Sequence, residues 1–293
     1  MMKIAAIVHV FYPDLWPELF LCLGNALRSV PCDVFVTYSD DAAVRQARLD
    51  CPDASFIPCE NVGFDVWPFL KTLDRIDLSS YSHVLKLHTK RDVPPEPRIA
   101  FNGMDCTGAR WRDELLSFVR TPDVWRATLA KIAEPNVAAV AGVRCILRRN
   151  DVPMEPTRMS FDRGLELARS VGLRPIRPQF VGGTMFLMRA EMLAPLRGRW
   201  RAEDFAVPIG HGSGTLSHDI ERLVGFCACV NGWKIADPGG ELHSYRRRVA
   251  VQNALDRVAR FFWQTKCTRG GGRIVKLLRV PVWRTSRRKD VEA

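Results

Sequence analysis

The first ninety residues alternate short apolar runs with amphipathic stretches, and this alternation leaves few folds open to the chain. Apolar runs of strand length lie at residues 3–10, 33–38, 54–58 and 83–88. Stretches with the apolar spacing of helices lie between them, at residues 15–29, 40–49 and 66–76. Strands separated by helices pair in parallel, with helices covering the sheet. The pattern therefore predicts an α/β half-domain of the nucleotide-binding kind.

The rest of the main body continues this mixture of helices and strands. Helices are predicted at 109–120, 121–133, 161–171, 190–196 and 216–229, and strands at 137–143, 185–189 and 233–236. An irregular basic loop is predicted at 144–157. Residues 92–108 are rich in Pro, Gly, Asn and Met, which is typical either of a loop that closes over a substrate or of a plain surface connection.

The positive charge of the chain is concentrated at its end. The net charge is +11, yet residues 1–243 carry 29 Lys and Arg against 29 Asp and Glu, whereas residues 244–293 carry 14 against 3. We therefore expect a main domain at 1–245 and a basic, partly helical tail at 246–293. A helix is predicted at 249–265, a hinge at 269–273 and a Leu-, Val- and Trp-rich basic segment after it. Such a segment suits an anionic membrane surface; the alternative is a disordered basic tail without a target.

Cysteine usage and the missing motifs exclude several classes of protein. Nine cysteines are scattered without CxxC pairs, which favours reduced thiols and a cytoplasmic location. No apolar run is long enough to cross a bilayer, and the first ten residues fit a strand better than a signal peptide. No nucleoside-triphosphate, dinucleotide, kinase or nucleic-acid-binding signature is present.

The strand predicted at 83–88 ends in a burst of polar and cationic residues. These are Lys86, His88, Thr89, Lys90 and Arg91. In open α/β sheets ligands bind beyond the carboxyl ends of the strands, and Lys, Arg and hydroxyl groups bind phosphate oxygens there. We therefore predict an anion site, with Lys90 and Arg91 in direct contact and Lys86 and His88 forming its floor. The alternative is a solvated strand edge.

Two glycine-containing turns precede predicted elements. In the first, Asn61, Gly63 and Asp65 form a loop in which the carboxylate can accept a hydrogen bond from a ribose or sugar hydroxyl. Asp65 is equally suited to cap the helix that follows it. In the second, Gly182, Gly183 and Thr184 precede a strand, and paired glycines let a ligand approach the backbone closely. We assign both turns to nucleotide or sugar binding.

A third glycine-rich segment, residues 212–222, leads into a helix with several titratable residues in its first turns. Glu221 is the candidate general base for an acceptor hydroxyl. Asp219 is the second candidate, although an acid near a helix start also compensates the helix dipole. We place Thr215, His218 and Arg222 on the acceptor side.

No metal or cofactor is predicted. The six histidines are dispersed without HxxxH or HExxH spacing, no CxxC is present, and the chain has no DxD triplet. Sequence patterns thus give no reason to expect a divalent ion held by protein carboxylates.

Four segments together resemble the rhamnan synthesis protein F family of bacterial glycosyltransferases. They are residues 61–70, 83–91, 180–186 and 214–223, which occur in the family's order within residues 3–245. The resemblance implies a GT-A-like α/β fold with a mixed, mostly parallel central sheet flanked by helices. It also implies transfer of a deoxysugar, typically rhamnose, from a nucleotide donor to a cell-surface polysaccharide or lipid-linked glycan.

The chain departs from the family pattern at Val62, Leu187 and Ser213, where the family often has Arg, an aromatic residue and an acid. GT-A enzymes commonly bind the donor diphosphate through a metal on a DxD motif; since this motif is missing, we expect Lys86, Lys90 and Arg91 to supply the charge.

We therefore predict an inverting glycosyltransferase in the cytoplasm, peripheral on the inner face of the cell membrane. Its partners are a nucleotide-sugar donor, a polysaccharide or lipid-linked glycan acceptor and the anionic membrane surface. The alternatives are an inactive glycan-binding or assembly module, suggested by Val62 and Ser213, and a nucleic-acid-binding protein, suggested by the basic tail.

Overall fold

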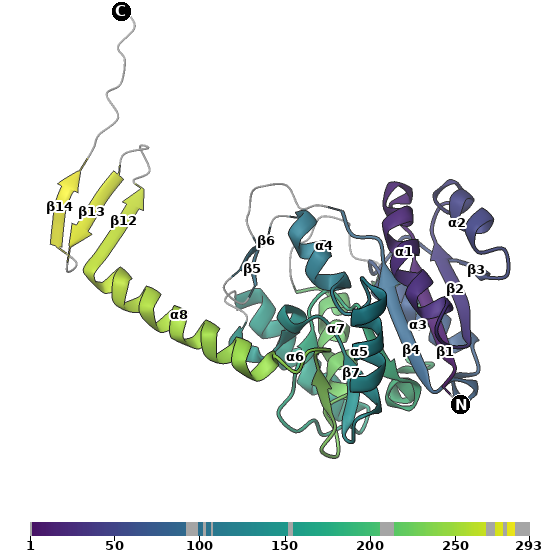
Figure 1. The fold of residues 1–293 in the computed structure, drawn as a ribbon. Coiled ribbons are helices and arrows are strands. Elements are labelled where there is room, and N and C mark those ends of the chain that lie inside the picture. Colours follow the sequence, from purple (N-terminus) through teal and green to yellow (C-terminus); the bar gives the residue numbers. More distant parts are fainter. Residues whose placement is uncertain are drawn as a thin grey trace, which may run out of the picture. The chain divides into compact units, whose positions relative to one another are not determined.

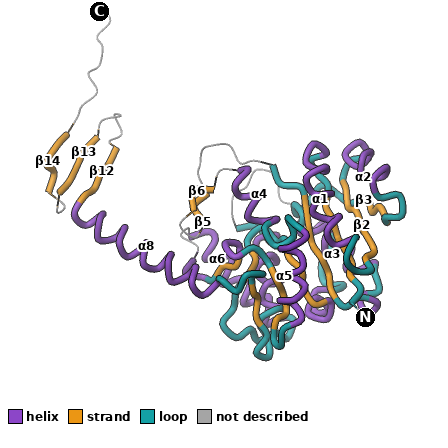
Figure 2. The backbone as a smooth tube through the Cα atoms, viewed as in Figure 1, coloured by secondary structure: helices purple, strands orange, loops and turns teal. Residues whose placement is uncertain are grey.

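A computed structural model describes residues 2–91, 99–101, 104–106, 108–151, 155–205, 214–267, 273–277 and 280–284. Within it the chain divides into two compact units, Met1–Leu242 and His243–Ala293, and each is described by itself. Figure 1 shows the course of the chain and Figure 2 shows its helices and strands.

The first unit holds the elements expected of an α/β domain. Its strands are β1 (Ile4–His9), β2 (Cys32–Tyr38), β3 (Ser55–Pro58), β4 (His83–His88), β5 (Ile99–Phe101), β6 (Met104–Cys106), β7 (Val137–Val140), β8 (Ile146–Leu147), β9 (Phe180–Val181), β10 (Phe186–Arg189) and β11 (Lys234–Ala236). Its α-helices are α1 (Trp16–Leu27), α2 (Arg45–Asp50), α3 (Val66–Arg75), α4 (Gly108–Leu116), α5 (Pro122–Ala133), α6 (Glu155–Ser170) and α7 (Leu216–Cys227). Short 3₁₀ helices complete it, among them η2 (Asp41–Val44) and η6 (Ala190–Leu196).

Seven strands form the central sheet in the order β11-β7-β10-β4-β1-β2-β3. Pairing is parallel throughout except at β10, which runs antiparallel to both β4 and β7. The sheet is therefore mixed and mostly parallel, which confirms the predicted fold class.

Helices cover both faces of this sheet because of how the chain crosses it. The connections through α1 and α2 step from β1 to β2 to β3, whereas the connection through α3 returns across the sheet to β4. Since parallel crossovers are right-handed, connections that run in opposite directions lie on opposite faces. In agreement, α1 contacts α5, while α3 contacts α7, which packs on α6.

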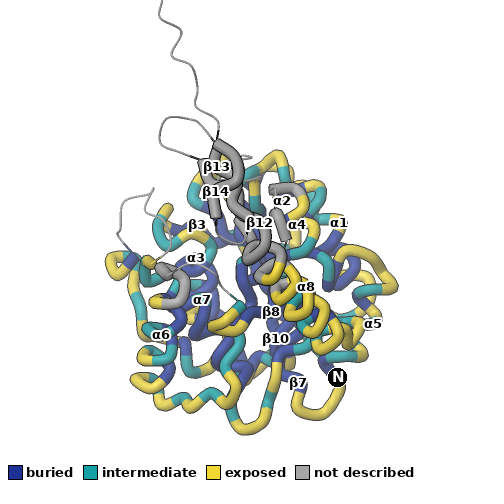
Figure 3. Tube along the Cα trace, turned by 90° about the vertical axis from the view of Figure 1, so that its left-hand side faces the viewer, coloured by how far each residue is buried: buried dark blue, intermediate teal, exposed yellow. Residues whose placement is uncertain are grey.

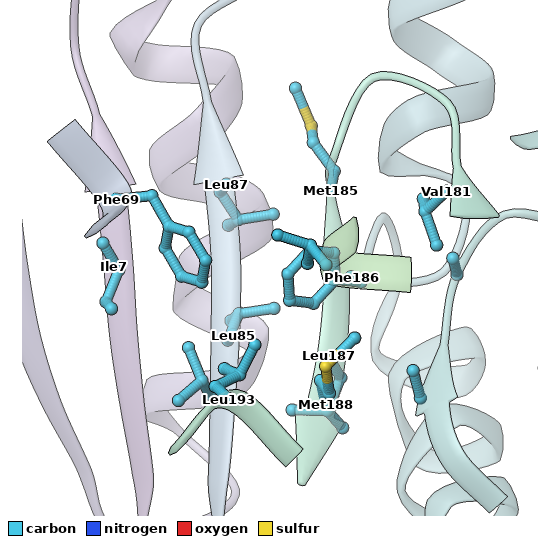
Figure 4. Packing of buried hydrophobic residues seen from close by; sticks show 14 of the residues in the cluster. Ile7, Phe69, Leu85, Leu87, Val181, Met185, Phe186, Leu187, Met188 and Leu193 are labelled. Carbon is cyan, nitrogen blue, oxygen red and sulfur yellow. The ribbon is translucent and has the colours of Figure 1, made fainter. Parts of the chain in front are cut away.

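Burial follows from this layering. Every residue of β1, β4 and β7 is buried, whereas in the edge strand β3 only Ile57 is. Figure 3 shows buried chain within the first unit and exposed chain around it. Phe69 of α3 and Phe186 of β10 meet edge to face, with ring centroids 6.0 Å apart. Phe186 is the register partner of Lys86, so the alternation of a strand puts the buried side chains of Leu85 and Leu87, also drawn in Figure 4, on the opposite face of β4. The strand that carries the predicted anion site is thus fixed on both faces.

Several sequence predictions differ from the structure in detail. The predicted basic loop at 144–157 contains β8, which pairs antiparallel with β9, and it ends in the first turn of α6. The predicted helix at 190–196 is a 3₁₀ helix with Pro195 inside it. The predicted loop at 92–108 lies largely outside the described residues; its described part contains β5 and β6, which pair antiparallel.

The second unit is part helix and part sheet. Helix α8 (Leu242–Phe262) is followed by β12 (Trp263–Cys267), β13 (Arg273–Leu277) and β14 (Val280–Arg284), which form an antiparallel sheet. The predicted helix at 249–265 therefore begins earlier and ends earlier than expected, and residues 263–265 belong to β12. Most of the predicted hinge at 269–273 lies outside the described residues. No helix within the described ranges is both long and apolar enough to span a bilayer.

Candidate functional site

The candidate site lies where the strand order reverses. Strands β1 and β4 are neighbours, and their last residues, His9 and His88, are partners in the register. The chain leaves β1 toward β2 on one side and enters β4 on the other, which makes this edge the topological switch point where ligands bind in open α/β sheets. Thr89 joins the two strand ends, because its hydroxyl oxygen accepts hydrogen bonds from the backbone N–H groups of Phe11 and Tyr12, each at 3.0 Å.

A buried ion pair lies beneath this edge. The Lys86 ammonium, with its side chain 3% exposed, donates to the Asp65 carboxylate, to the Thr184 carbonyl at 3.1 Å and to the Thr184 hydroxyl at 2.7 Å. The same carboxylate also accepts a hydrogen bond from that hydroxyl. An ammonium has three N–H donors, and these partners account for all of them. Lys86 was expected to form the floor of the site and to supply charge to the diphosphate; its ammonium is instead used within the protein, where it ties the 61–65 loop to the 182–184 turn.

The surroundings fix the charge state of this pair. Burial alone would raise the pKa of the Asp65 carboxyl, but the Lys86 ammonium and the hydrogen bonds from Lys86 and Thr184 hold it well below its usual range. Burial lowers the pKa of Lys86, and Asp65 opposes that shift. Asp65 occupies the N-cap position of α3, yet its side chain makes no capping hydrogen bond. Its carboxylate is used for the ion pair and not for the helix end.

Two neutral histidines adjoin the pair. His88 is 3% exposed, and neither of its ring nitrogens has a hydrogen-bond partner among the described residues. Its Nδ1 lies 3.6 Å from the Asp65 carboxylate. Burial lowers the pKa of His88 to about 3 and that of His9 to about 4. His9 also bonds through Nδ1 to the Thr37 hydroxyl at 3.0 Å. Both rings are therefore uncharged at neutral pH, and His88 forms part of the floor of the site.

Lys90 and Arg91 lie at the rim. Arg91 pairs with Asp14 at 3.0 Å, with both side chains more than half exposed, and its guanidinium lies 4.7 Å from the centroid of the Tyr12 ring. Exposed pairs of this kind are weak, about 0–1 kcal/mol, so a ligand can displace Asp14. Lys90 is half-buried, and within the described part of the chain its ammonium pairs with no carboxylate. These two cations are available to an anion, whereas Lys86 is not.

The two glycine turns owe their shape to left-handed backbone. Gly63 and Phe64 have φ values of +67° and 54°, and Gly183 and Thr184 have +79° and 50°. A Cβ added at Gly183 would lie 2.4 Å from the Leu115 side chain. Glycine is the residue that adopts this backbone freely. The turns bring Asp65 and Thr184, which are 119 positions apart in the sequence, into hydrogen-bonding contact.

Both predicted catalytic carboxylates are engaged by other protein groups. Glu221 accepts a hydrogen bond from the backbone N–H of Gly183 at 2.6 Å and pairs with Arg222. Asp219 accepts two hydrogen bonds from Arg163, at 2.7 and 2.8 Å. Glu221 therefore clamps the 182–184 turn onto α7, and Asp219 joins α7 to α6.

The predicted acceptor-side residues share the first turns of α7. The His218 ring nitrogen Nδ1 lies 2.8 Å from the Thr215 hydroxyl, and the ring contacts Phe64 edge to face, with centroids 5.9 Å apart. Arg222 is 3% exposed; it donates to the His218 carbonyl at 2.8 Å and lies 4.5 Å from the centroid of the Phe180 ring. Arg222 is thus part of the packing, while His218 faces the 61–65 loop.

A hollow of about 320 Å³ opens beside the ends of β1 and β2. Its wall is formed by Val10, Phe11, Pro13, Ser39, Asp40, Ala42, Ala43 and Asn61. The volume is at the lower end of the range of about 300–1,000 Å³ usual for small-molecule sites. Asn61 is among the residues predicted to bind the nucleotide or sugar, whereas Asp40 is not. Asp40 accepts a hydrogen bond from the Ala42 N–H at 2.9 Å, as a helix cap does. Its position directly after β2, at the edge of the sheet where ligands bind, is the sequence feature that could have predicted it as a site residue.

The described residues offer no preformed carboxylate site for a metal ion. Among the described residues no three His, Cys, Asp or Glu side chains converge on a point that a metal ion could occupy. The carboxylate nearest the strand end, Asp65, is already neutralised by Lys86. We therefore assign no chemical step to a metal.

Comparisons with known proteins agree with the family resemblance in the sequence. The chain is 25% and 24% identical over 234 residues to protein WxcX from two strains of Xanthomonas campestris pv. campestris; the match covers 78% of this chain and 32% of the relative. The chain thus spans about a third of the length of these curated relatives.

Among solved structures, the chain is similar to a crystal structure of S. aureus TarS 1-349, with 9% identity and a TM-score of 0.37 over 86% of this chain and 65% of that one. A family model described as rhamnan synthesis protein F matches residues 1–233. As this match takes in most of the 293 residues, the chain belongs to the rhamnan synthesis protein F family.

Proposed function

We propose that this protein is an inverting glycosyltransferase that moves a sugar from a nucleotide-sugar donor to a glycan acceptor. Rhamnose or a related deoxysugar is the expected sugar, and a cell-surface polysaccharide or lipid-linked glycan is the expected acceptor, as the family name suggests. One observation carries the proposal: the hollow beside β1 and β2 and the cations Lys90 and Arg91 after β4 lie at the switch point of a mostly parallel sheet.

The donor is proposed to bind along this edge. Its nucleoside occupies the hollow, where Asp40 and Asn61 offer polar groups for the base or ribose. Its diphosphate lies toward Thr89, Lys90 and Arg91. Cations placed where negative charge develops stabilise a departing diphosphate. Lys90 and Arg91 do this without a protein-held metal in our proposal.

The test is a panel of nucleotide sugars offered to the purified full chain, with release of the nucleoside diphosphate measured with and without acceptor glycans. We expect release from one donor class, and we expect it to persist in excess EDTA. Activity that returns only with Mn²⁺ or Mg²⁺ would remove the metal-free part of the proposal. Donor binding without any release would favour the inactive glycan-binding module.

Variants of the rim separate the proposed roles. Lys90→Gln removes a cation proposed to contact the diphosphate, and we expect the rate of transfer to fall by about 5- to 30-fold, as the loss of one to two kcal/mol of transition-state stabilisation implies. Asp40→Asn is expected to change the KM of the donor more than kcat. Lys3→Gln is the matched control, because Lys3 pairs with Asp33 at the amino ends of β1 and β2, the edge of the sheet opposite the proposed site.

We also propose that the protein works in the cytoplasm, on the inner face of the cell membrane. The support is the charge of the second unit and the apolar side chains Val251, Leu255 and Val258 on α8, each more than half exposed. A lipid-linked acceptor would give such an association a purpose.

A further inference from the structure

The engaged carboxylates leave the acceptor without an evident base. Glu221 accepts from the Gly183 N–H and from Arg222, and Asp219 is held by two hydrogen bonds from Arg163. A proton taken up by either carboxylate would weaken a contact that holds α7 in place. The acceptor hydroxyl must nevertheless lose a proton when it attacks, so another group near α7 has to accept it.

Among the described residues, His218 is the titratable side chain at the N-terminal end of α7 that is held in one orientation and is partly exposed. The Thr215 hydroxyl lies 2.8 Å from Nδ1, and the Phe64 ring packs against the imidazole from the 61–65 loop. The side chain is partly exposed, and Nε2 has no hydrogen-bond partner among the described residues. In the tautomer whose Nδ1–H donates to the Thr215 oxygen, Nε2 carries the lone pair. A general base requires this tautomer.

The charges around the ring keep it in the basic form. Asp219, Glu221 and Arg222 face it from α7, and Lys90 faces it from the end of β4. Burial lowers the pKa of His218 below its usual value; Glu221 and Asp219 oppose that shift, and Arg222 and Lys90 add to it. The imidazole is therefore neutral at neutral pH. Lys90 is also a proposed diphosphate ligand, so the ring and the leaving group lie near the same cation.

We propose that His218, and neither Glu221 nor Asp219, is the general base of the transfer reaction, with Thr215 as the residue that positions it. The inference rests on the proposed glycosyltransferase function and deepens it. Nε2 takes the proton of the acceptor hydroxyl as that oxygen forms its bond to the anomeric carbon. The bond from the anomeric carbon to the donor phosphate oxygen breaks, and its electron pair leaves with the diphosphate. The imidazolium then returns its proton to water.

The experiment compares His218→Ala, His218→Gln and wild type with the donor that the panel identifies. We expect kcat to fall by about 100-fold or more in both variants, the usual range for loss of a general base, while binding of the nucleoside diphosphate by titration calorimetry changes little. Added imidazole is expected to restore part of the rate to His218→Ala, whose cavity admits it, and none to His218→Gln. Rescue of this kind reports proton transfer and is not expected of a structural role.

The pH profile provides the second readout. Wild type is expected to lose kcat/KM as pH falls through the pKa of His218, and the His218 variants are expected to lack that limb. Thr215→Val should keep the limb and lower the rate, since it removes only the positioning contact. Thermal unfolding verifies that each variant is folded.

Two results would overturn the inference. Full activity in a folded His218→Ala would show that another group accepts the proton, and so would an acid limb that survives in both His218 variants. Either result would leave the proposed glycosyltransferase standing. A wild-type chain that turns over no donor would overturn both proposals, so the two failures are distinguishable.

Discussion

At the scale of single residues, the Asp65–Lys86 pair shows how one strand serves two purposes. Successive side chains of β4 point to opposite faces of the sheet, so Lys86 and His88 lie on one face and Leu85 and Leu87 on the other. All four are buried. A buried ammonium is tolerable only with its partners in place, and here they come from two turns distant in the sequence. Lys86 is therefore a structural cation beneath the candidate site, and the cations that we propose as diphosphate ligands follow it in the chain.

Removing one member of this pair is expected to be costly. Lys86→Met leaves the Asp65 carboxylate buried without its cation, and we expect the free energy of unfolding to fall by about 3–5 kcal/mol. Urea denaturation measures this loss of stability. Lys3→Met is the control, because Lys3 and Asp33 form a pair with side chains 44% and 45% exposed, for which we expect less than about 1 kcal/mol. Asp65→Asn combined with Lys86→Met should recover part of the loss; an equal or larger loss would contradict the ion-pair explanation.

The buried histidines predict how stability depends on pH. The pKa values of His9 and His88 are about 4 and about 3 in the folded protein, against 6.5 for an exposed histidine. Between these values the unfolded chain binds more protons, so stability is present above pH 6.5 and is lost as the pH falls. The expected slope is about 1.4 kcal/mol per pH unit for each histidine.

Denaturation between pH 7 and pH 4.5 tests this dependence, and His88→Gln should flatten it. His83→Gln should do so too, because burial lowers the pKa of His83 to about 4 at the opposite end of the same strand. A slope unchanged in both variants would contradict burial as the cause.

At the scale of elements, the 182–184 turn connects more of the site than any other segment described above. It follows β9, precedes β10, and is held by Glu221 from α7 and by Asp65 and Lys86 from the opposite side. Strand β10 is also the one antiparallel member of the central sheet. The turn reverses the chain within the sheet and places Thr184 against the ion pair.

Gly183→Ala is expected to disturb this turn. Position 183 has φ +79°, and the added Cβ would lie 2.4 Å from Leu115, which is fully buried. Gly172→Ala is the matched control, because position 172 has φ +82° and nothing within 4 Å of an added Cβ. Both variants bear the strain of left-handed backbone, about 1–2 kcal/mol. Gly183→Ala should lose about 1–3 kcal/mol more from overpacking; thermal unfolding of the two should therefore differ, and equal losses would contradict the packing argument.

The elements that the sequence predicted well are those with a clear local pattern of apolar residues. Strand β4 and helix α3 appear within a residue or so of their expected bounds, since a continuous apolar run and an amphipathic period are properties of the local chain. Strand β8 was missed, because two residues carry no period, and its pairing with β9 comes from a partner more than thirty positions away. The 3₁₀ form of η6 follows from Pro195, which cannot continue an α-helix.

At the scale of the whole molecule, the charge is divided between the two units. The neutral first unit contains the candidate site, and the second unit begins with a helix that bears Arg246, Arg247 and Arg248 near its start. Its apolar side chains Val251, Leu255 and Val258 are spaced as on one side of a helix and are exposed by 60%, 58% and 55%. This combination is the basis for expecting attraction to an anionic lipid surface.

Vesicle co-sedimentation tests this expectation with the full chain. We expect binding to vesicles that contain anionic lipid, and its loss at high salt. Arg247→Gln with Arg248→Gln should weaken binding by about 30-fold, because each cation near the headgroups contributes about 1 kcal/mol. Arg199→Gln with Arg201→Gln removes the same charge from exposed positions of the first unit and should leave binding nearly unchanged. Equal losses in the two pairs would point to net charge and against α8.

The amino-acid sequence by itself determined the α/β class, the family, the uneven charge and the four segments that form the site, because apolar period, composition and local motifs are properties of neighbouring residues. Only the tertiary structure decided what the side chains of those segments do. The burial of Lys86, its engagement by Asp65 and Thr184, and the clamp from Glu221 to Gly183 all depend on contacts between distant segments. A buried charge selects its partner through proximity and the cost of desolvation, and proximity is set by the order of strands in the sheet.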